Sequence, residues 1–244
     1  MMIRKAFKKF IPNYWLEYYN YKKKLWRKCA SENIKINDRF TEYYNTNHWG
    51  GKESISGRGS DSFQTEILIK ELSKLFNDYN IKSILDIPCG DFNWMKNLDF
   101  SDKNYLGGDI VPDLIFKNRE FFADRVNVRF EVMDITKDDL PKVDIIICRD
   151  CLVHLSYKDI FKSISNIKKN NCNFLLATSF IDRKRNYNIL TGDWRPINLE
   201  KKPFNFPIPQ LIINENCTED NGKYSDKSMC LWNISNIEVK PFKY

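Results

Sequence analysis

The sequence lacks any long apolar run, and this absence excludes a membrane-spanning helix. None of its hydrophobic stretches approaches the roughly 20 residues that a span requires. The N-terminus also lacks the charged head, apolar centre and small-residue cleavage site of a secretory signal. We therefore expect a soluble, cytoplasmic protein, either free or bound peripherally at the inner membrane face.

A disulfide framework is not expected either. The seven cysteines are an odd number, and several lie in apolar runs typical of strands. This pattern indicates reduced thiols, as in the cytoplasm. Cys148 and Cys151 have C-x-x-C spacing, but no second cysteine pair or histidine pair at zinc spacing accompanies them. We predict two buried structural thiols there and no metal site.

Positive charge is scarce outside the first 28 residues. Residues 1–28 hold nine Lys/Arg and one acid, so the rest of the chain carries −1 of the total charge of +7. A basic stripe across the fold is therefore not expected, which argues against a nucleic-acid partner. Aromatic residues alternate with the cations of residues 1–28. A helix of this kind binds an anionic membrane surface or a partner, or packs on its own domain.

Glycine is scarce where a dinucleotide site would need it. An apolar run, residues 84–87, turns at Pro88-Cys89-Gly90 toward a possible helix start. Such a strand–turn–helix places a nucleotide-type cofactor at the carboxyl end of the strand. Gly90 stands alone where G-x-G-x-x-G requires three glycines, and Asp86 and Asp91 flank it. Two carboxylates repel a pyrophosphate and suit a cationic ligand.

Strands and helices alternate along the rest of the chain. Apolar periodicity predicts helices over residues 61–80, 111–122 and 156–169, with a short one after Gly90. Capping boxes are expected at Asp61 and Ser156. The expected strands are residues 81–87, 104–108, 128–133, 143–148, 173–178, 211–214 and 228–234. This alternation implies parallel βαβ units and a sheet that is covered on both faces.

Acids follow the carboxyl ends of four successive expected strands: Asp86, Asp109, Asp134 and Asp150. Because the carboxyl ends of parallel strands lie at one edge of the sheet, we expect these four acids to line a binding crevice there. Asp109 lies 19 residues beyond Gly90, a spacing at which an acid reaches the hydroxyls of a ribose. The alternative is an aspartate that only caps the following helix. Arg58 stands between two glycines, and its guanidinium can form two hydrogen bonds to a ligand carboxylate. The alternative is that this segment is an ordinary loop with no ligand.

The stretch Asp86–Met95 resembles motif I of the class I S-adenosylmethionine (SAM)-dependent methyltransferases, with Pro88 and Phe92 where glycines are usual. Four phrases are similar to a bacterial subgroup associated with surface-polysaccharide (capsule or O-antigen) biosynthesis. They are Ser-Gly-Arg-Gly-Ser, Asp-Ile-Pro-Cys-Gly-Asp-Phe-Asn-Trp-Met, Cys-Arg-Asp-Cys-Leu-Val-His-Leu-Ser and Thr-Gly-Asp-Trp-Arg-Pro.

The resemblance implies a Rossmann-like α/β fold: a doubly wound, seven-stranded, mostly parallel sheet with an antiparallel last strand. It implies SAM as cofactor in a domain over residues 46–244, preceded by a basic aromatic helical extension, residues 1–45. Residues 179–210 would form an insert that caps the substrate. The implied cofactor-binding residues are Arg58, Asp86, Pro88, Gly90, Asp109, Ile110, Asp134, Ile135 and Arg149.

The implied reaction is O-methylation of a sugar, a nucleotide-sugar or a phosphate-linked group. His154 is the first candidate for the general base and Asp150 the second, although a structural histidine is an equal alternative for His154. Asp193, Trp194 and Arg195 are candidates for gripping the acceptor. The competing hypotheses are an RNA methyltransferase that uses the basic N-terminal arm, a non-catalytic SAM-binding module, and an NAD enzyme.

Overall fold

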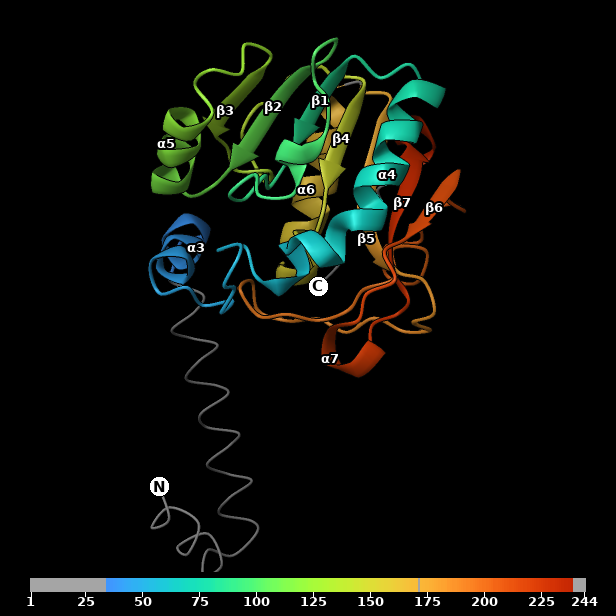
Figure 1. Ribbon diagram of the computed structural model, residues 1–244. Coiled ribbons are helices and arrows are strands. Elements are labelled where there is room, and N and C mark those ends of the chain that lie inside the picture. The colour runs from blue at the N-terminus through green and yellow to red at the C-terminus, as the bar shows by residue number, and fades with distance from the viewer. Residues whose placement is uncertain (1–33, 171, 239–244) are drawn as a thin grey trace, which may run out of the picture. The chain divides into compact units, whose positions relative to one another are not determined.

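The computed structural model describes residues 34–170 and 172–238 (Figure 1). The chain divides into two compact units, Met1–Ile36 and Asn37–Tyr244. Most of the expected N-terminal extension lies outside the described residues, which include its last part with α3 (Ile36–Asn45). The sheet and the strands belong to the second unit.

Seven strands form one sheet in the order β3-β2-β1-β4-β5-β7-β6. They are β1 (Ser83–Asp86), β2 (Asn104–Asp109), β3 (Val128–Val132), β4 (Ile145–Cys148), β5 (Phe174–Phe180), β6 (Leu211–Asn214) and β7 (Lys227–Asn233). The first five strands run parallel, whereas β7 is antiparallel to both of its neighbours. This confirms the predicted sheet and its reversed last strand. The strand order changes direction between β1 and β4.

Helices cover both faces of the sheet. α4 (Ser62–Asp78) and α5 (Pro112–Phe121) pack on one face, and α6 (Tyr157–Lys169) packs on the other (Figure 1). Buried residues at helical spacing face the strands: Leu68, Leu72 and Leu75 from α4, and Ile160, Ile164 and Ile167 from α6. The central strands β1 and β4 are therefore covered on both sides, which agrees with Ile84 and Leu85 of β1 and the wholly apolar sequence of β4. The short helices are η2 (Arg58–Ser60), η3 (Met95–Asn97), η4 (Leu152–His154), α7 (Glu219–Gly222) and η5 (Ile234–Asn236).

The two expected capping boxes have different outcomes. Ser156 caps α6 as predicted, because its Oγ accepts a hydrogen bond from the backbone N–H of Asp159 at 3.2 Å. Asp61 precedes α4, but its side chain makes no capping bond. A carboxylate from upstream takes that role: Glu53 accepts from the backbone N–H of Ser62 at 3.0 Å.

The expected helix after Gly90 is reduced to the single 3-10 turn η3. Phe92 has a φ of 56°, a left-handed conformation that interrupts a helix. Its ring is fully buried and lies within about 5 Å of the Tyr105 and Phe130 rings. We attribute the left-handed backbone conformation of Phe92 to the burial of its ring in this aromatic cluster.

The segment between β5 and β6, which contains the expected insert, has no helix or regular strand, yet buried side chains hold it in place. The Arg195 side chain is fully buried, and Asn198 is nearly so. The backbone N–H groups of Gly192 and Arg195 donate to the carbonyls of His154 and Val153 at 2.8 and 3.1 Å. The segment thus contacts η4, which follows the carboxyl end of β4.

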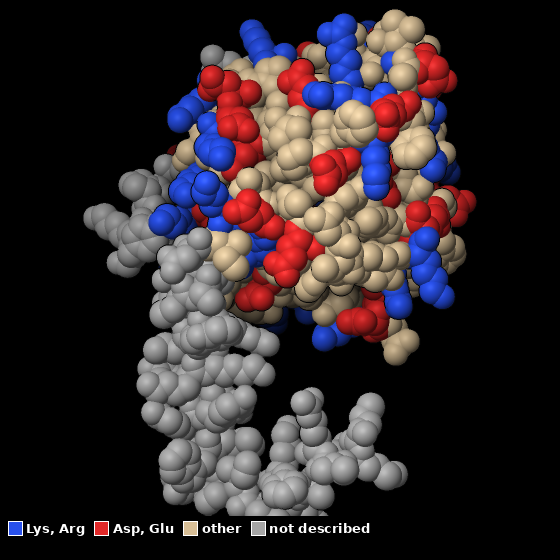
Figure 2. Space-filling model, turned by 90° about the vertical axis from the view of Figure 1, so that its left-hand side faces the viewer, with Lys and Arg blue, Asp and Glu red and all other residues tan. Residues whose placement is uncertain are grey.

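Charge of both signs is mixed on the described surface. On the face at the α5 and β3 side, Lys and Arg are interspersed with Asp and Glu (Figure 2). This mixture agrees with the nearly neutral composition of the chain after residue 28. Within residues 34–170 and 172–238, no helix is long and apolar enough to cross a membrane.

Candidate active site

The carboxyl ends of the parallel strands carry the expected row of acids. Asp86 and Asp109 end β1 and β2, and Asp134 and Asp150 each lie two positions beyond β3 and β4. The first three are buried, whereas the Asp150 side chain is 30% exposed. They lie around the point where the strand order reverses, the usual ligand position in such sheets.

Asp86 is buried, and the uncharged hydroxyl of Tyr105 donates a hydrogen bond to its carboxylate. The Tyr105 hydroxyl donates to its Oδ2 at 2.7 Å. Burial raises the Asp86 pKa to about 7, although the Tyr105 hydrogen bond and the nearby Arg149 charge oppose the shift. The Asp86 carboxylate would therefore be stabilised by a cationic ligand.

Asp109 links the loop that follows β1 to the loop that follows β2. Its carboxylate accepts from the backbone N–H groups of Gly90 and Val111 at 3.2 and 3.0 Å. Burial raises its pKa to about 6, against these hydrogen bonds. Because a carboxylate offers about four acceptor positions, Asp109 keeps capacity for the hydroxyls of a ligand.

Gly90 has a backbone that only glycine tolerates well. Its φ is +54°, and a Cβ there would lie 2.2 Å from the Ser56 Oγ. The same loop is held by Asp91, whose carboxylate accepts from the Ser54 Oγ and the Ile55 N–H, both at 2.9 Å. Residues 53–60 therefore lie across the ends of the central strands.

The other expected cofactor residues are placed at the same edge. Asp134 accepts from the N–H and the Oγ1 of Thr136 at 2.9 and 2.7 Å. Pro88, Ile110 and Ile135 are chain neighbours of the acids and of Gly90, and Ile135 is buried. Their contact with a cofactor stays a prediction.

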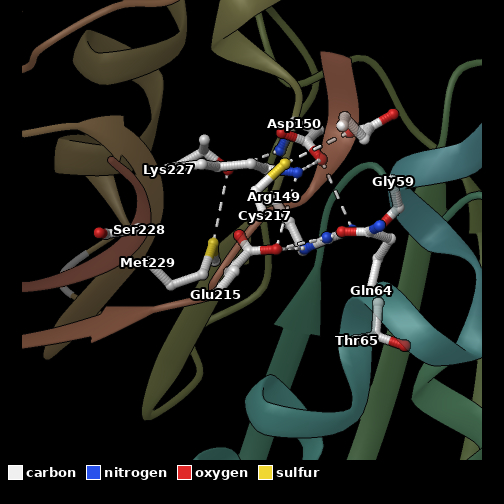
Figure 3. A network of polar contacts seen from close by, with 12 residues as sticks. Gly59, Gln64, Thr65, Arg149, Asp150, Glu215, Cys217, Lys227, Ser228 and Met229 are labelled. Atoms are coloured by element: carbon white, nitrogen blue, oxygen red, sulfur yellow. Dashed lines mark hydrogen bonds and ion pairs between the residues drawn. The ribbon is translucent and has the colours of Figure 1, made fainter. Parts of the chain in front are cut away.

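Arg149, an expected cofactor residue, is engaged by groups of the chain itself, and its contact with a cofactor stays a prediction. It is buried, and its Nη2 pairs with the Glu215 carboxylate at 2.5 Å and donates to the Gly59 carbonyl at 2.7 Å (Figure 3). Its guanidinium also lies over the Trp94 ring. Arg149 therefore fixes the loop at Gly59. Arg58, the neighbouring candidate, has an exposed side chain.

Asp150 is held as an ionised carboxylate. Its Oδ2 lies 2.5 Å from the Lys227 Nζ and 3.5 Å from Arg149 (Figure 3). Burial alone would raise its pKa, but Lys227 and Arg149 together lower it to about 2. Asp150 is therefore a weaker base than His154, whose pKa is about 4. The second candidate for the base is therefore disfavoured.

His154, the last residue of η4, has a defined tautomer. Its Nδ1 lies 3.1 Å from the carbonyl oxygen of Asp193. A carbonyl only accepts, so Nδ1 must carry the proton and Nε2 must hold the lone pair. Burial lowers the His154 pKa to about 4, which keeps the ring neutral at pH 7. The Trp49 ring lies 4.3 Å from the imidazole and forms a wall beside it.

Arg195, expected as an acceptor residue, lies in the interior and bonds to backbone carbonyls, so the structure adds no support for that role. Its guanidinium is fully buried and donates to the carbonyls of Leu152, Val153 and Leu155 at 2.8 to 2.9 Å. It therefore fixes η4, which carries His154. Trp194 is 38% exposed and packs edge-on against Tyr224. Asp193 is exposed, so it and Trp194 keep their predicted role as candidates.

Three residues of the site were not predicted from the sequence: Trp49, Glu215 and Lys227. Lys227 lies 77 positions from Asp150, and Glu215 lies 66 positions from Arg149. Of the three, only Lys227 had a local signal in the sequence. It directly precedes the apolar run of the last expected strand, which places it at an end of that strand. Its partner could not be identified from local sequence.

Comparisons with known proteins found one family model and several solved structures that are similar to this chain. Residues 84–170 match a family model described as a methyltransferase domain. The methyltransferase domain of bacterial CtHen1-C is 13% identical, with a TM-score of 0.43, over 48% of this chain and 66% of that one. PKMT2 from Rickettsia typhi is 20% identical, with a TM-score of 0.39, over 49% of this chain and 26% of that one.

A third similar structure is magnesium protoporphyrin IX methyltransferase (ChlM) from Synechocystis PCC 6803, crystallised with bound SAM. It is 16% identical, with a TM-score of 0.48, over 64% of this chain and 81% of that one. The chain spans less than two thirds of the length of the first two structures. No curated protein sequence matches it.

Proposed function

We propose, from the SAM-dependent methyltransferase domain that residues 84–170 carry, that the chain O-methylates a hydroxyl group. The proposed acceptor is a sugar, a nucleotide-sugar or a phosphate-linked group of a bacterial surface polysaccharide. Support for this acceptor class comes from the sequence phrases around residues 56–60, 86–95, 148–156 and 191–196. Support for transfer to oxygen comes from His154.

The cofactor of the domain is SAM, and the buried acids fit it. Asp86 and Asp109 have raised pKa values, so positive charge nearby favours their ionised forms. Asp86 suits the ammonium group, and Asp109 suits the ribose hydroxyls. When bound, SAM supplies a methyl group on a positively charged sulfur, which an acceptor oxygen attacks in line.

His154 carries the proton transfer in this proposal. A hydroxyl is a poor nucleophile until its proton has a base to move to. The Nε2 of His154 has its lone pair available, because the carbonyl of Asp193 fixes the proton on Nδ1. Nε2 would accept the hydroxyl proton as the acceptor oxygen takes the methyl group, the bond from that methyl to sulfur breaks, and the cofactor leaves as a neutral thioether. Trp49 excludes water from one side of the imidazole.

The observation that carries the proposal is this neutral, oriented imidazole at the end of β4, in the same row as the buried acids. Calorimetry with SAM tests the cofactor site. Uptake of labelled methyl from SAM by sugars, nucleotide-sugars and phosphorylated acceptors then tests the reaction. Binding of SAM with no methyl uptake by any hydroxyl acceptor would favour the non-catalytic alternative.

The basic N-terminal arm supports two further proposals about partners. Its net charge of +8 suits either an anionic membrane surface or RNA. We favour the membrane, because polysaccharide precursors are commonly membrane-bound and the face of the described residues that Figure 2 shows mixes both signs of charge. The RNA alternative requires that methyl transfer depend on the arm.

A further inference from the structure

Asp150 is held in a strained backbone conformation at the mouth of the site. Its φ is 50°, unusual for a residue other than glycine. Its backbone N–H donates to the Thr178 Oγ1 at 2.8 Å, and its Oδ2 meets Lys227. Strained residues that several contacts hold in place occur mainly at functional sites. The side chain remains 30% exposed, so the carboxylate can reach a ligand.

Lys227 is a buried lysine for which the fold provides two acids. It is the first residue of β7, and it pairs with Phe180 at the carboxyl end of β5 because β7 is antiparallel. Its side chain is 5% exposed, and its Nζ lies 2.5 Å from Asp150 and 3.6 Å from Glu215. Burial of an ammonium group destabilises the folded state unless carboxylates balance its charge. The ion pair between Lys227 and Asp150 therefore fixes the position of both side chains.

The charges around Asp150 leave little attraction for an anion. The charged and titratable groups of this cluster are Lys227 from β7, Arg149 directly after β4, the neutral His154 from η4, Glu215, and Glu219 from α7. Both cations are paired with carboxylates, and a Cβ on Gly59 would lie 3.2 to 3.6 Å from Glu219, Lys227 and Asp150. Within the described residues, this group has more acids than cations.

We infer that Lys227 is a positioning residue that directs the Asp150 carboxylate toward the acceptor, and that this carboxylate selects acceptors with a hydrogen-bond donor beside the reacting hydroxyl. A vicinal hydroxyl or an amino group fits this position, whereas a carboxylate or phosphate is repelled. The inference rests on the proposed O-methyltransferase function. In this inference the two residues have separate roles: His154 accepts the proton, and Asp150 orients the acceptor.

The test uses the full chain, labelled SAM, and matched pairs of methyl hexopyranosides and their uronic acid forms. Wild-type protein should have at least a tenfold larger kcat/KM for the neutral member of a pair. Lys227→Met should raise the acceptor KM about tenfold and leave the Kd for SAM unchanged. Lys227→Arg should restore most of the activity. Lys82→Met, at an exposed ion pair at the other edge of the sheet, is the matched control.

A pH profile separates positioning from a merely structural role. Without Lys227, burial raises the Asp150 pKa, so at saturating SAM the acidic limb of the acceptor kcat/KM should move to higher pH than in wild type. If Lys227→Met does not fold, Asp150→Asn replaces it, because asparagine tolerates a positive φ. This variant should lose the preference for the neutral acceptor.

The outcomes are distinct. A Lys227→Met protein with the wild-type KM and pH profile, or a wild type that prefers the uronic acid form, would overturn the inference while the proposed function stands. SAM binding without methyl uptake by these pairs, by nucleotide-sugars or by phosphorylated acceptors would overturn the proposed function and the inference with it.

Discussion

At the scale of single residues, burial sets the chemistry of the site. The same sheet edge holds Asp86 with a pKa raised to about 7 and Asp150 with a pKa lowered to about 2. The difference arises because Asp86 has a neutral tyrosine as its donor, whereas Asp150 has a lysine and an arginine. Sequence predicted the positions of these acids but not their partners.

The histidine leads to a prediction about pH. Because burial lowers the His154 pKa to about 4, methyl transfer should lose activity as pH falls through 4, not through the ordinary value of 6.5. His154→Ala should lower kcat by roughly 10²- to 10⁴-fold with little change in the Kd for SAM. Steady-state rates across pH measure both effects.

His48→Ala is the control, since His48 is exposed and stacks on Tyr43. A wild-type limb centred near pH 6.5, or an unchanged turnover in His154→Ala, would remove the histidine from the mechanism.

The buried acids lead to a prediction about proton release. In the free protein Asp86 and Asp109 titrate near pH 7 and pH 6, and positive charge on SAM favours their ionised forms. SAM binding at about pH 6 should therefore release protons, and affinity should fall as pH drops below 7. Calorimetry in buffers of different ionisation enthalpy measures the protons.

Asp86→Asn should bind SAM more weakly and release fewer protons. Proton uptake, or equal release by wild type and Asp86→Asn, would contradict this assignment of Asp86.

Two arginines illustrate the limit of residue-level prediction. The family resemblance suggested a cofactor role for Arg149, and the affinity of arginine for phosphates and uronates suggested an acceptor role for Arg195. Both instead satisfy groups of the chain itself: a carboxylate 66 positions away for Arg149, and carbonyls about 40 positions away for Arg195. Such partners are set by tertiary folding and leave no trace in local spacing.

At the scale of elements, the sequence predicted the strands and helices well. Apolar periodicity is local, so the boundaries of α4, α5, α6 and the strands agree with the expected ranges to within about two or three residues. The misses occur where a distant group intervenes. Glu53 replaces the expected Asp61 cap, and the burial of Phe92 removes the expected helix after Gly90.

The cap of α6 leads to a prediction about stability. Ser156→Ala removes the acceptor for the Asp159 N–H and should lower the free energy of unfolding by about 1 kcal/mol. Denaturant unfolding of the two proteins measures the difference. Ser73→Ala is the control, because Ser73 is exposed in the middle of α4 and its replacement by a good helix former should cost little. Equal losses in both variants would deny the capping role.

At the scale of the whole molecule, the boundary between the two units separates the basic arm from the catalytic unit. The unit Asn37–Tyr244 contains the row of acids, His154 and the Lys227 pair. Removal of residues 1–33 should therefore leave methyl transfer to a small acceptor within about twofold of wild type. The RNA alternative predicts a large loss and, for the intact chain, a rate that falls steeply with salt. Rates of both proteins at low and high salt distinguish the two.

The cofactor and acceptor sides of the site have different origins in the chain. The acids that we propose for SAM lie within residues 86–134, whereas the proposed acceptor side combines Trp49, Asp150, His154 and Lys227 from separate segments. In descendants of this gene, new acceptors could thus evolve by exchange of the late loops and the β7 edge, while the methyl-donor half is inherited unchanged.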